Sequence, residues 1–219
     1  MSKAKLIIVG EATVGKTSIL LQYNENNFQE NYLTTIGNDK IIKDFTINGK
    51  KVRIDIWDTA GQEKYRAVNK IFMKNTQIAL IVYSITDKNS YDQLSFWINQ
   101  VKEVNKDKQI IFGIAANKSD LFEQQVIDTE KGKKFADDNN CLFFETSAKD
   151  HGSIVNVFDK LVEKYVENNN NEKDEVQNLQ SQNNNNQIID NDNIFIESAE
   201  TDNLNDVEKP RKDCSCSKC

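Results

Sequence analysis

The chain has 219 residues and is acidic, with 28 basic and 34 acidic residues and a formal net charge of −6. Residues 1–167 are neutral, because the whole acidic excess lies in residues 168–219. This balance excludes the basic footprint of a nucleic-acid-binding domain, and no apolar run approaches the roughly 18 residues that a membrane span needs. We therefore expect a chain that is kept in the cytosol with its thiols reduced.

The first motif is a glycine-rich loop that follows an apolar run. Residues 5–9 predict a buried parallel strand, and a helical pattern begins after residue 17. Between them, residues 10–17 read G-E-A-T-V-G-K-T and fit the P-loop pattern G-x-x-x-x-G-K-[ST]. The two glycines let backbone N–H groups point at an anion, and the helix N-terminus favours negative charge. We therefore predict a phosphate site, with Lys16 on the β- and γ-phosphates and the Thr17 hydroxyl on Mg²⁺.

Strand-like and helix-like runs then alternate along the chain. We expect strands at 41–47, 51–57, 78–83, 109–115 and 142–144, and helices at 64–74, 90–101, 130–138 and 154–166. Asn48-Gly49 between the first two strands is a strong type I′ hairpin signal. Ser90 and Gln93 have capping-box spacing and predict a helix start. The alternation predicts an α/β fold, whose mostly parallel sheet has one antiparallel edge strand and helices on both faces.

The polar motifs all follow the ends of predicted strands, which is where parallel sheets bind ligands. Asn117-Lys118-Ser119-Asp120 follows the strand at 109–115, and Ser147-Ala148-Lys149 follows the strand at 142–144. A carboxylate at Asp120 can accept hydrogen bonds from guanine N1–H and from the 2-amino group, which adenine lacks. A site built around such a partner rejects the analogue without it by about 10⁴–10⁵. We therefore predict one guanine-nucleotide site assembled from these loops.

These motifs resemble those of the Ras superfamily of small GTPases, and within it the Rab branch. The resemblance covers residues 1–167, the expected small G domain, and extends to the cysteines at the chain end. It implies binding of GTP or GDP with Mg²⁺, and slow hydrolysis of GTP that a partner accelerates. It also implies a monomeric switch in vesicle-mediated membrane traffic. An exchange factor, a GTPase-activating protein and effectors would contact its switch loops.

The resemblance also implies roles for individual residues. Phe28 would stack on the base, the Gly61 N–H would contact the γ-phosphate, and Gln62 would orient the attacking water. Thr17, Thr35 and Asp58 would hold Mg²⁺. The expected nucleotide-binding residues are Glu11, Ala12, Thr13, Val14, Gly15, Lys16, Thr17, Ser18, Phe28, Thr35, Gly61, Asn117, Lys118, Asp120, Ser147, Ala148 and Lys149.

Two of the positions that depart from the family pattern bear on function. Lys40 stands where the Rab pattern has an aromatic residue, so the aromatic triad that includes Trp57 and Phe72 is incomplete. Ala12 replaces a glycine of many Ras-type relatives, and we expect slowed rather than abolished hydrolysis. Two alternatives stay open. One is a GTP-binding, membrane-tethered scaffold with negligible hydrolysis, and the other is a P-loop kinase or ATPase, which the guanine-reading motif opposes.

The segment 168–219 is rich in asparagine and acidic residues, and we predict that it is a disordered tail. It ends with Cys214, Cys216 and Cys219, which form a poor C-a-a-X box but resemble the paired cysteines of Rab proteins. Two lipids would anchor the chain more stably than one. The resemblance thus implies prenylation, membrane-extraction factors and the cytoplasmic face of an endomembrane such as the endosome, in exchange with the cytosol. A metal site of three thiolates is the rival interpretation.

Overall fold

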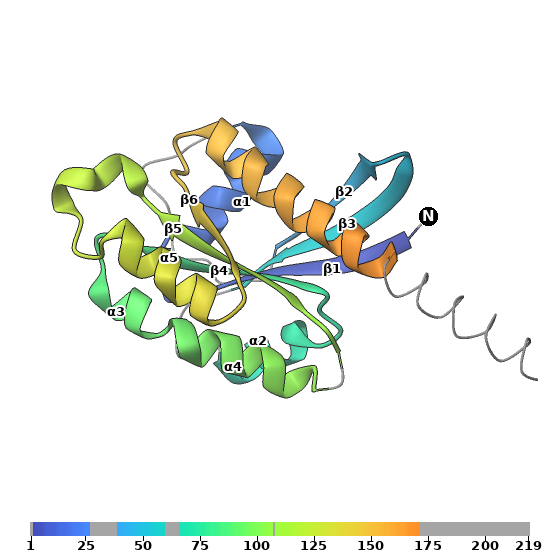
Figure 1. The fold of residues 1–219 in the computed structure, drawn as a ribbon, viewed down its shortest axis with the longest axis horizontal. Helices are drawn as coiled ribbons and strands as arrows, with labels where there is room; N and C mark the ends of the chain where they lie inside the picture. Colours follow the sequence, from blue (N-terminus) through green and yellow to red (C-terminus); the bar gives the residue numbers. More distant parts are fainter. Residues whose placement is uncertain (1, 27–38, 60–65, 107, 171–219) are drawn as a thin grey trace, which may run out of the picture. The chain divides into compact units, whose positions relative to one another are not determined.

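The computed structural model describes residues 2–26, 39–59, 66–106 and 108–170. Its centre is a six-stranded sheet in the order β2-β3-β1-β4-β5-β6 (Figure 1). The strands are β1 (Ser2–Val9), β2 (Lys40–Ile47), β3 (Lys50–Asp58), β4 (Ile78–Ser84), β5 (Ile111–Asn117) and β6 (Leu142–Glu145). Only the β2–β3 pair is antiparallel among these described strands. The predicted sheet is therefore confirmed, including its antiparallel edge strand.

Helices cover both faces of the sheet. They are α1 (Lys16–Glu25), α2 (Arg66–Met73), α3 (Lys88–Asp92), α4 (Leu94–Val104), α5 (Thr129–Asp138), the 3₁₀ segment η2 (Ser119–Gln124) and a last helix over 151–170. Helix α1 and the last helix pack on one face, and α2 to α5 pack on the other (Figure 1). No helix in the described ranges combines the length and apolar character that crossing a bilayer would demand.

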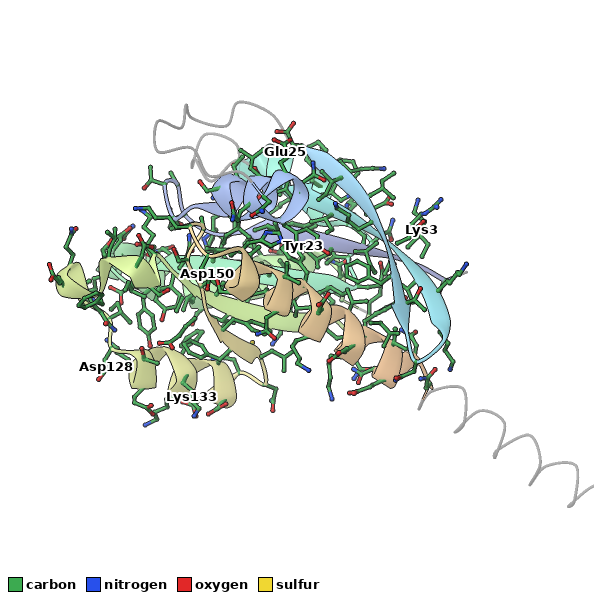
Figure 2. All side chains as sticks on the ribbon, turned by 90° about the horizontal axis from the view of Figure 1, so that it is seen from above. Lys3, Tyr23, Glu25, Asp128, Lys133 and Asp150 are labelled. Carbon is green, nitrogen blue, oxygen red and sulfur yellow. The ribbon has the colours of Figure 1, made fainter. Side chains whose placement is uncertain are left out.

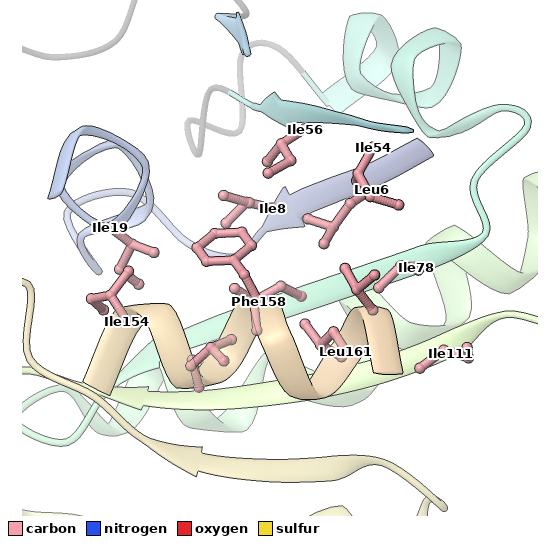
Figure 3. Packing of buried hydrophobic residues seen from close by; sticks show 14 of the residues in the cluster. Leu6, Ile8, Ile19, Ile54, Ile56, Ile78, Ile111, Ile154, Phe158 and Leu161 are labelled. Carbon is pink, nitrogen blue, oxygen red and sulfur yellow. The ribbon is translucent and has the colours of Figure 1, made fainter. Parts of the chain in front are cut away.

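The alternation of side chains in β1 supplies both halves of the core. Leu6 and Ile8 join one cluster and Ile7 and Val9 join the other, all fully buried. In the first cluster, side chains of the last helix meet those of the sheet (Figure 3). Tyr23 of α1, labelled in Figure 2, stacks on the last helix through Phe158, with 4.0 Å between ring centroids. This two-sided burial explains why the central strands are continuous apolar runs.

The predicted hairpin is confirmed. Asn48 and Gly49 have φ values of 50° and 74°, and a type I′ turn requires positive φ at both central residues. Cys141 is buried. Burial raises the pKa of its thiol to about 11, against a smaller opposite effect of Lys102. Cys141 is therefore a protonated thiol at neutral pH.

The prediction that Ser90 and Gln93 form a capping box is wrong. Asp87 caps α3 instead, since its side chain accepts a hydrogen bond from the Asn89 N–H at 2.9 Å. Ser90 lies buried inside that helix, where its Oγ donates to the Asp87 carbonyl at 2.7 Å and accepts from the Ser84 N–H at 3.0 Å. A better cap three residues earlier thus starts the helix before the predicted position.

The last helix also continues beyond the expected start of the tail. Residues 168–170 are helical, although we predicted that the unstructured segment begins at residue 168. Two side chains support this extra turn. Asn169 Nδ2 donates to the Tyr165 carbonyl at 2.7 Å, and Lys50 Nζ donates to Asn170 Oδ1. One local and one long-range hydrogen bond therefore support the helix in the asparagine run.

Lys40, which stands at an aromatic position of the Rab pattern, is the exposed first residue of β2. Its Nζ is 3.1 Å from Asp55 Oδ2 and 5.3 Å from the centroid of the Trp57 ring. Trp57 in turn lies 5.8 Å from Phe72 between ring centroids. A cation thus stands beside the remaining aromatic pair. Burial acts to raise the pKa of Asp55, but hydrogen bonds from Lys3 and Lys40 outweigh it and the net pKa is lowered.

Candidate nucleotide site

The glycine-rich loop connects β1 to α1, as predicted. A Cβ on Gly10 would lie 2.2 Å from the Val82 carbonyl oxygen of β4, so only glycine fits there. Gly15 has φ of 99° and is the residue before α1, and Thr13 also has positive φ, at 63°. The loop therefore has the left-handed residues that turn successive N–H groups toward one point.

Lys16 is buried at the start of α1, with 5% of its surface exposed. Its Nζ donates to the carbonyl oxygens of Gly10 at 3.0 Å and Glu11 at 2.7 Å. Burial lowers its pKa to about 8, while the Asp58 and Glu11 carboxylates oppose the shift. The ammonium therefore stays mostly protonated at neutral pH. A buried cation at a helix N-terminus fits a phosphate group.

Asp58 at the end of β3 meets Thr17 at the start of α1. The Thr17 hydroxyl donates to Asp58 Oδ2, and Asp58 Oδ1 is buried without a hydrogen-bond partner. Burial raises the pKa of Asp58 to about 6, partly offset by Thr17 and Lys16. A buried carboxylate oxygen without a partner, beside a hydroxyl, fits Mg²⁺, which takes oxygen ligands and is often held by one or two carboxylates together with phosphates.

The segment after β5 is tied directly to the glycine-rich loop. Asn117 is buried, and its Nδ2 donates to the Val14 carbonyl at 2.7 Å, while its Oδ1 accepts from the Thr146 hydroxyl at 3.2 Å. A Cβ on Gly15 would lie 2.4 Å from the same Nδ2. One amide therefore joins the loops that follow β1, β5 and β6.

Asp120 is held in place by the loop after β6. Its Oδ1 accepts from Ser147 Oγ at 2.7 Å, and its Oδ2 is 3.4 Å from Lys149 Nζ. Burial acts to raise the pKa of Asp120, but the hydrogen bonds from Ser147, its own backbone and Lys149 outweigh it, so the pKa is lowered. Asp120 is therefore an oriented, ionised and exposed acceptor at the rim of the site.

Comparison with known proteins agrees with this geometry. The family model described as Ras family matches residues 5–167. The Ras-related protein RabQ of Dictyostelium discoideum is 40% identical over 74% of this chain and 79% of its own. The Ras-related protein Rab-3C of Mus musculus is 35% identical over 73% and 70%, and the GTP-binding protein ypt3 of Schizosaccharomyces pombe is 34% identical over 72% and 73%.

The chain belongs to the Ras family. Its relatives place it among the Rab-type small GTPases, as the motifs predicted. The Ras-family fold brings most of the predicted site residues to the carboxyl ends of the parallel strands. These are Glu11, Ala12, Thr13, Val14, Gly15, Lys16, Thr17 and Ser18 after β1, Asp58 at the end of β3, Asn117, Lys118 and Asp120 around the end of β5, and Ser147, Ala148 and Lys149 after β6.

Several other predictions fall on residues that lie outside the described ranges. They are Phe28, Thr35, Gly61 and Gln62 of the nucleotide site, and Cys214, Cys216 and Cys219 of the tail. Their roles remain predictions from the Ras-family motifs.

Sequence reasoning missed one contact of the Ras-family site. Trp97 Nε1 of α4 donates to Glu11 Oε1 in the glycine-rich loop at 3.1 Å. Trp97 is 2% exposed and lies on the apolar face of its helix, so its pattern indicated only a core residue. Its indole N–H was the available signal, because a buried indole usually finds an acceptor. The contact connects α4 to the phosphate loop.

Proposed function

We propose that this Rab-type GTPase is a Mg²⁺-dependent guanine-nucleotide switch in vesicle-mediated membrane traffic. The observation that carries the proposal is the junction at Asn117, which joins the phosphate loop to both base-side loops through buried hydrogen bonds. The junction ties the loop that contains Lys16 to the segment that contains Asp120, which supports one continuous site. Such a site suits a ligand with phosphates at one end and a hydrogen-bonding base at the other.

The Asp120 carboxylate would choose guanine. Ser147 and Lys149 hold its two oxygens, so the carboxylate is oriented before any ligand binds. Guanine offers two donors on one edge, N1–H and the exocyclic amine. Adenine presents an unprotonated N1 to the same carboxylate and loses both bonds. This difference supports GTP and GDP over ATP and ADP.

Hydrolysis would proceed by in-line attack of water on the γ-phosphoryl group. Lys16 and the loop N–H groups would stabilise the phosphate oxygens, and Gln62 would orient the water. Thr17, Thr35 and Asp58 would hold Mg²⁺, which supplies charge stabilisation when bound. The Gly61 N–H and Thr35 would sense the γ-phosphate, so that partners distinguish the two nucleotide states. We expect an intrinsic rate of about 10⁻⁴–10⁻³ s⁻¹, raised by a GTPase-activating protein in trans.

The place of action would be the cytoplasmic face of an endomembrane. The relationship to Rab proteins supports a role in membrane traffic. Lipids on Cys214, Cys216 and Cys219 would provide the anchor, with the segment 168–219 as the tether. Mass spectrometry of the protein from cells tests this directly, because three unmodified thiols would end the lipid hypothesis. A variant without the three cysteines should then be diffuse where the wild type is membrane-bound.

The base specificity can be tested by replacing one carboxylate oxygen of Asp120 with an amide NH₂ group. In Asp120→Asn, the amide can donate to the 2-oxo group of xanthine and accept from its N1–H, whereas it repels the guanine amine. We expect the variant to prefer xanthosine diphosphate over GDP, measured by competition against a fluorescent nucleotide. Asp128→Asn is the matched control, since Asp128 caps α5 and lies outside the site. Unchanged GDP preference in Asp120→Asn would refute the proposed role of Asp120.

The switch and the scaffold alternative differ in hydrolysis. Single-turnover measurements on the wild type and on Gln62→Leu, with and without cell extract, separate them. A switch hydrolyses GTP slowly alone and faster with extract, and the substitution removes both rates. A wild type that is silent even with extract would favour the scaffold. A Gln62→Leu variant that retains the wild-type rate would exclude Gln62 as the residue that orients water.

A further inference from the structure

A cavity lies at the end of the sheet opposite to the nucleotide loops. Its volume is about 370 Å³, and the segments around it connect α4 to β5 and α5 to β6 (Figure 1). These connections precede β5 and β6, so they lie at the amino ends of parallel strands. The nucleotide loops follow the carboxyl ends of the same strands. A ligand in this cavity would therefore not compete with a nucleotide.

Three exposed lysines contribute positive charge to the lining of the cavity. Lys102, Lys106 and Lys108 line it, and no carboxylate does so among the residues that the structure describes. Within that same part of the chain, none of the three lysines forms an ion pair with a carboxylate. Lys108 Nζ donates to the neutral Asn75 Oδ1 at 2.7 Å, and Lys102 Nζ lies 5.5 Å from the centroid of the Phe112 ring.

The lining of the cavity has polar and apolar parts. Asn105 at the end of α4 holds one wall, because its side chain donates to the Met73 and Val101 carbonyls at 2.7 and 2.9 Å. Asn139 and Asn140 add amide groups, and buried Phe112 adds a ring face. The cavity thus combines three ammonium groups, amides and an apolar floor. This combination suits a compact ligand with several negative charges on a ring, and lysine commonly binds phosphate as a point charge.

We propose that this cavity binds a small, multiply phosphorylated ring, the chemistry shared by a phosphoinositide headgroup and a free inositol polyphosphate. Binding leaves the guanine-nucleotide site free and is independent of hydrolysis. The proposal therefore goes beyond the nucleotide switch, and nucleotide affinity measured in the same samples keeps the two ideas separable.

The test uses the full-length, unlipidated chain saturated with GDP and Mg²⁺, so that the phosphate loop is filled. Inositol trisphosphate is titrated by calorimetry into the wild type and into Lys102→Gln/Lys106→Gln/Lys108→Gln. The matched control is Lys51→Gln/Lys133→Gln/Lys134→Gln, which removes the same charge from exposed positions outside the cavity. We expect saturable binding to the wild type, at least about tenfold weaker binding to the cavity variant, and near wild-type binding to the control.

The source of the phosphate is distinguished by sedimentation with phosphatidylcholine vesicles, with and without phosphatidylinositol bisphosphate. Retention that the cavity variant loses and the control keeps assigns a lipid headgroup. Saturation by inositol trisphosphate without vesicle retention assigns a free anion. Amide shifts at Asn139 and Asn140 on titration of the wild type locate the site without any substitution. Absence of saturable binding to the wild type, or equal losses in both variants, overturns the proposal.

Discussion

Asn117→Ala should uncouple the phosphate loop from the base loops. The substitution removes the amide that donates to the Val14 carbonyl at 2.7 Å and accepts from the Thr146 hydroxyl at 3.2 Å. Both partners are buried, so water cannot fully replace the lost group. The variant therefore tests whether this junction holds the site together.

The expected cost follows from the two hydrogen bonds. Leaving the buried Val14 carbonyl without this donor costs about 1–3 kcal/mol, and the loss at the Thr146 hydroxyl adds about 1 kcal/mol. The free energy of unfolding should fall by about 2–4 kcal/mol, which for a domain of this size lowers Tm by roughly 5–15 °C. Because the junction joins the loops that would hold the nucleotide, GDP should also dissociate about tenfold faster.

Thermal unfolding with excess GDP and Mg²⁺ measures the first effect, and release of a fluorescent GDP analogue measures the second. Asn105→Ala is the matched control. Asn105 is also buried, and its amide donates to the Met73 and Val101 carbonyls. It lies at the amino ends of the parallel strands, away from the nucleotide loops. We expect it to lose comparable stability while GDP dissociates at the wild-type rate.

Two results would refute the reasoning. One is GDP release from Asn117→Ala at the wild-type rate despite the loss of stability, since the junction would then be structural only. The other is equal acceleration in both variants, because global destabilisation would then explain the release.

Three other substitutions test separate features. Gly10→Ala would place a Cβ 2.2 Å from a backbone oxygen of β4. We expect the free energy of unfolding, measured in urea, to fall by about 3 kcal/mol or more. A Tm within a degree of wild type would contradict the close approach. Lys40→Met should cost about 0.5–1 kcal/mol at pH 7. Its partner Asp55 has a lowered pKa in the folded state, so this stabilisation is present above the ordinary aspartate pKa of about 3.9 and is lost as the pH falls through the folded value. The cost of Lys40→Met should therefore vanish in acid, and a constant difference across the pH series would count against the ion pair. Trp97→Phe keeps the ring in the core but removes the donor to Glu11, so GDP should dissociate about two- to fivefold faster, and an unchanged rate would show that the contact is incidental.

The sheet was predictable because apolar runs form its strands and clear turn signals, mainly glycine and asparagine, separate them. Gly10, Gly15 and Asn48-Gly49 each mark a positive-φ turn, and the structure has positive φ at all four residues. The phosphate and base motifs were predictable for a related reason. Each needs particular residue types at fixed spacing beside a strand end, and a parallel sheet brings those ends together.

The missed features all depend on competition or on contacts distant in sequence. Ser90 has the right spacing for a cap, but the helix starts earlier because the Asp87 carboxylate, one turn before it, accepts the capping hydrogen bond. The helix over 151–170 extends beyond its apolar pattern, because side-chain amides such as that of Asn169 form hydrogen bonds with it. Hydrophobic periodicity does not detect such bonds. Trp97 and Glu11 are 86 residues apart, and no local pattern encodes their contact.

The buried thiol of Cys141 gives the protein an internal reference for chemical labelling. With a pKa of about 11 and almost no exposed surface, it should not react with a maleimide at neutral pH while the domain is folded. Adducts counted by intact mass would then belong to Cys214, Cys216 and Cys219. Each lipid on those cysteines subtracts one adduct, and a fourth adduct appears only when the domain unfolds. A single reagent would thus report both the lipid stoichiometry of the tail and the integrity of the fold.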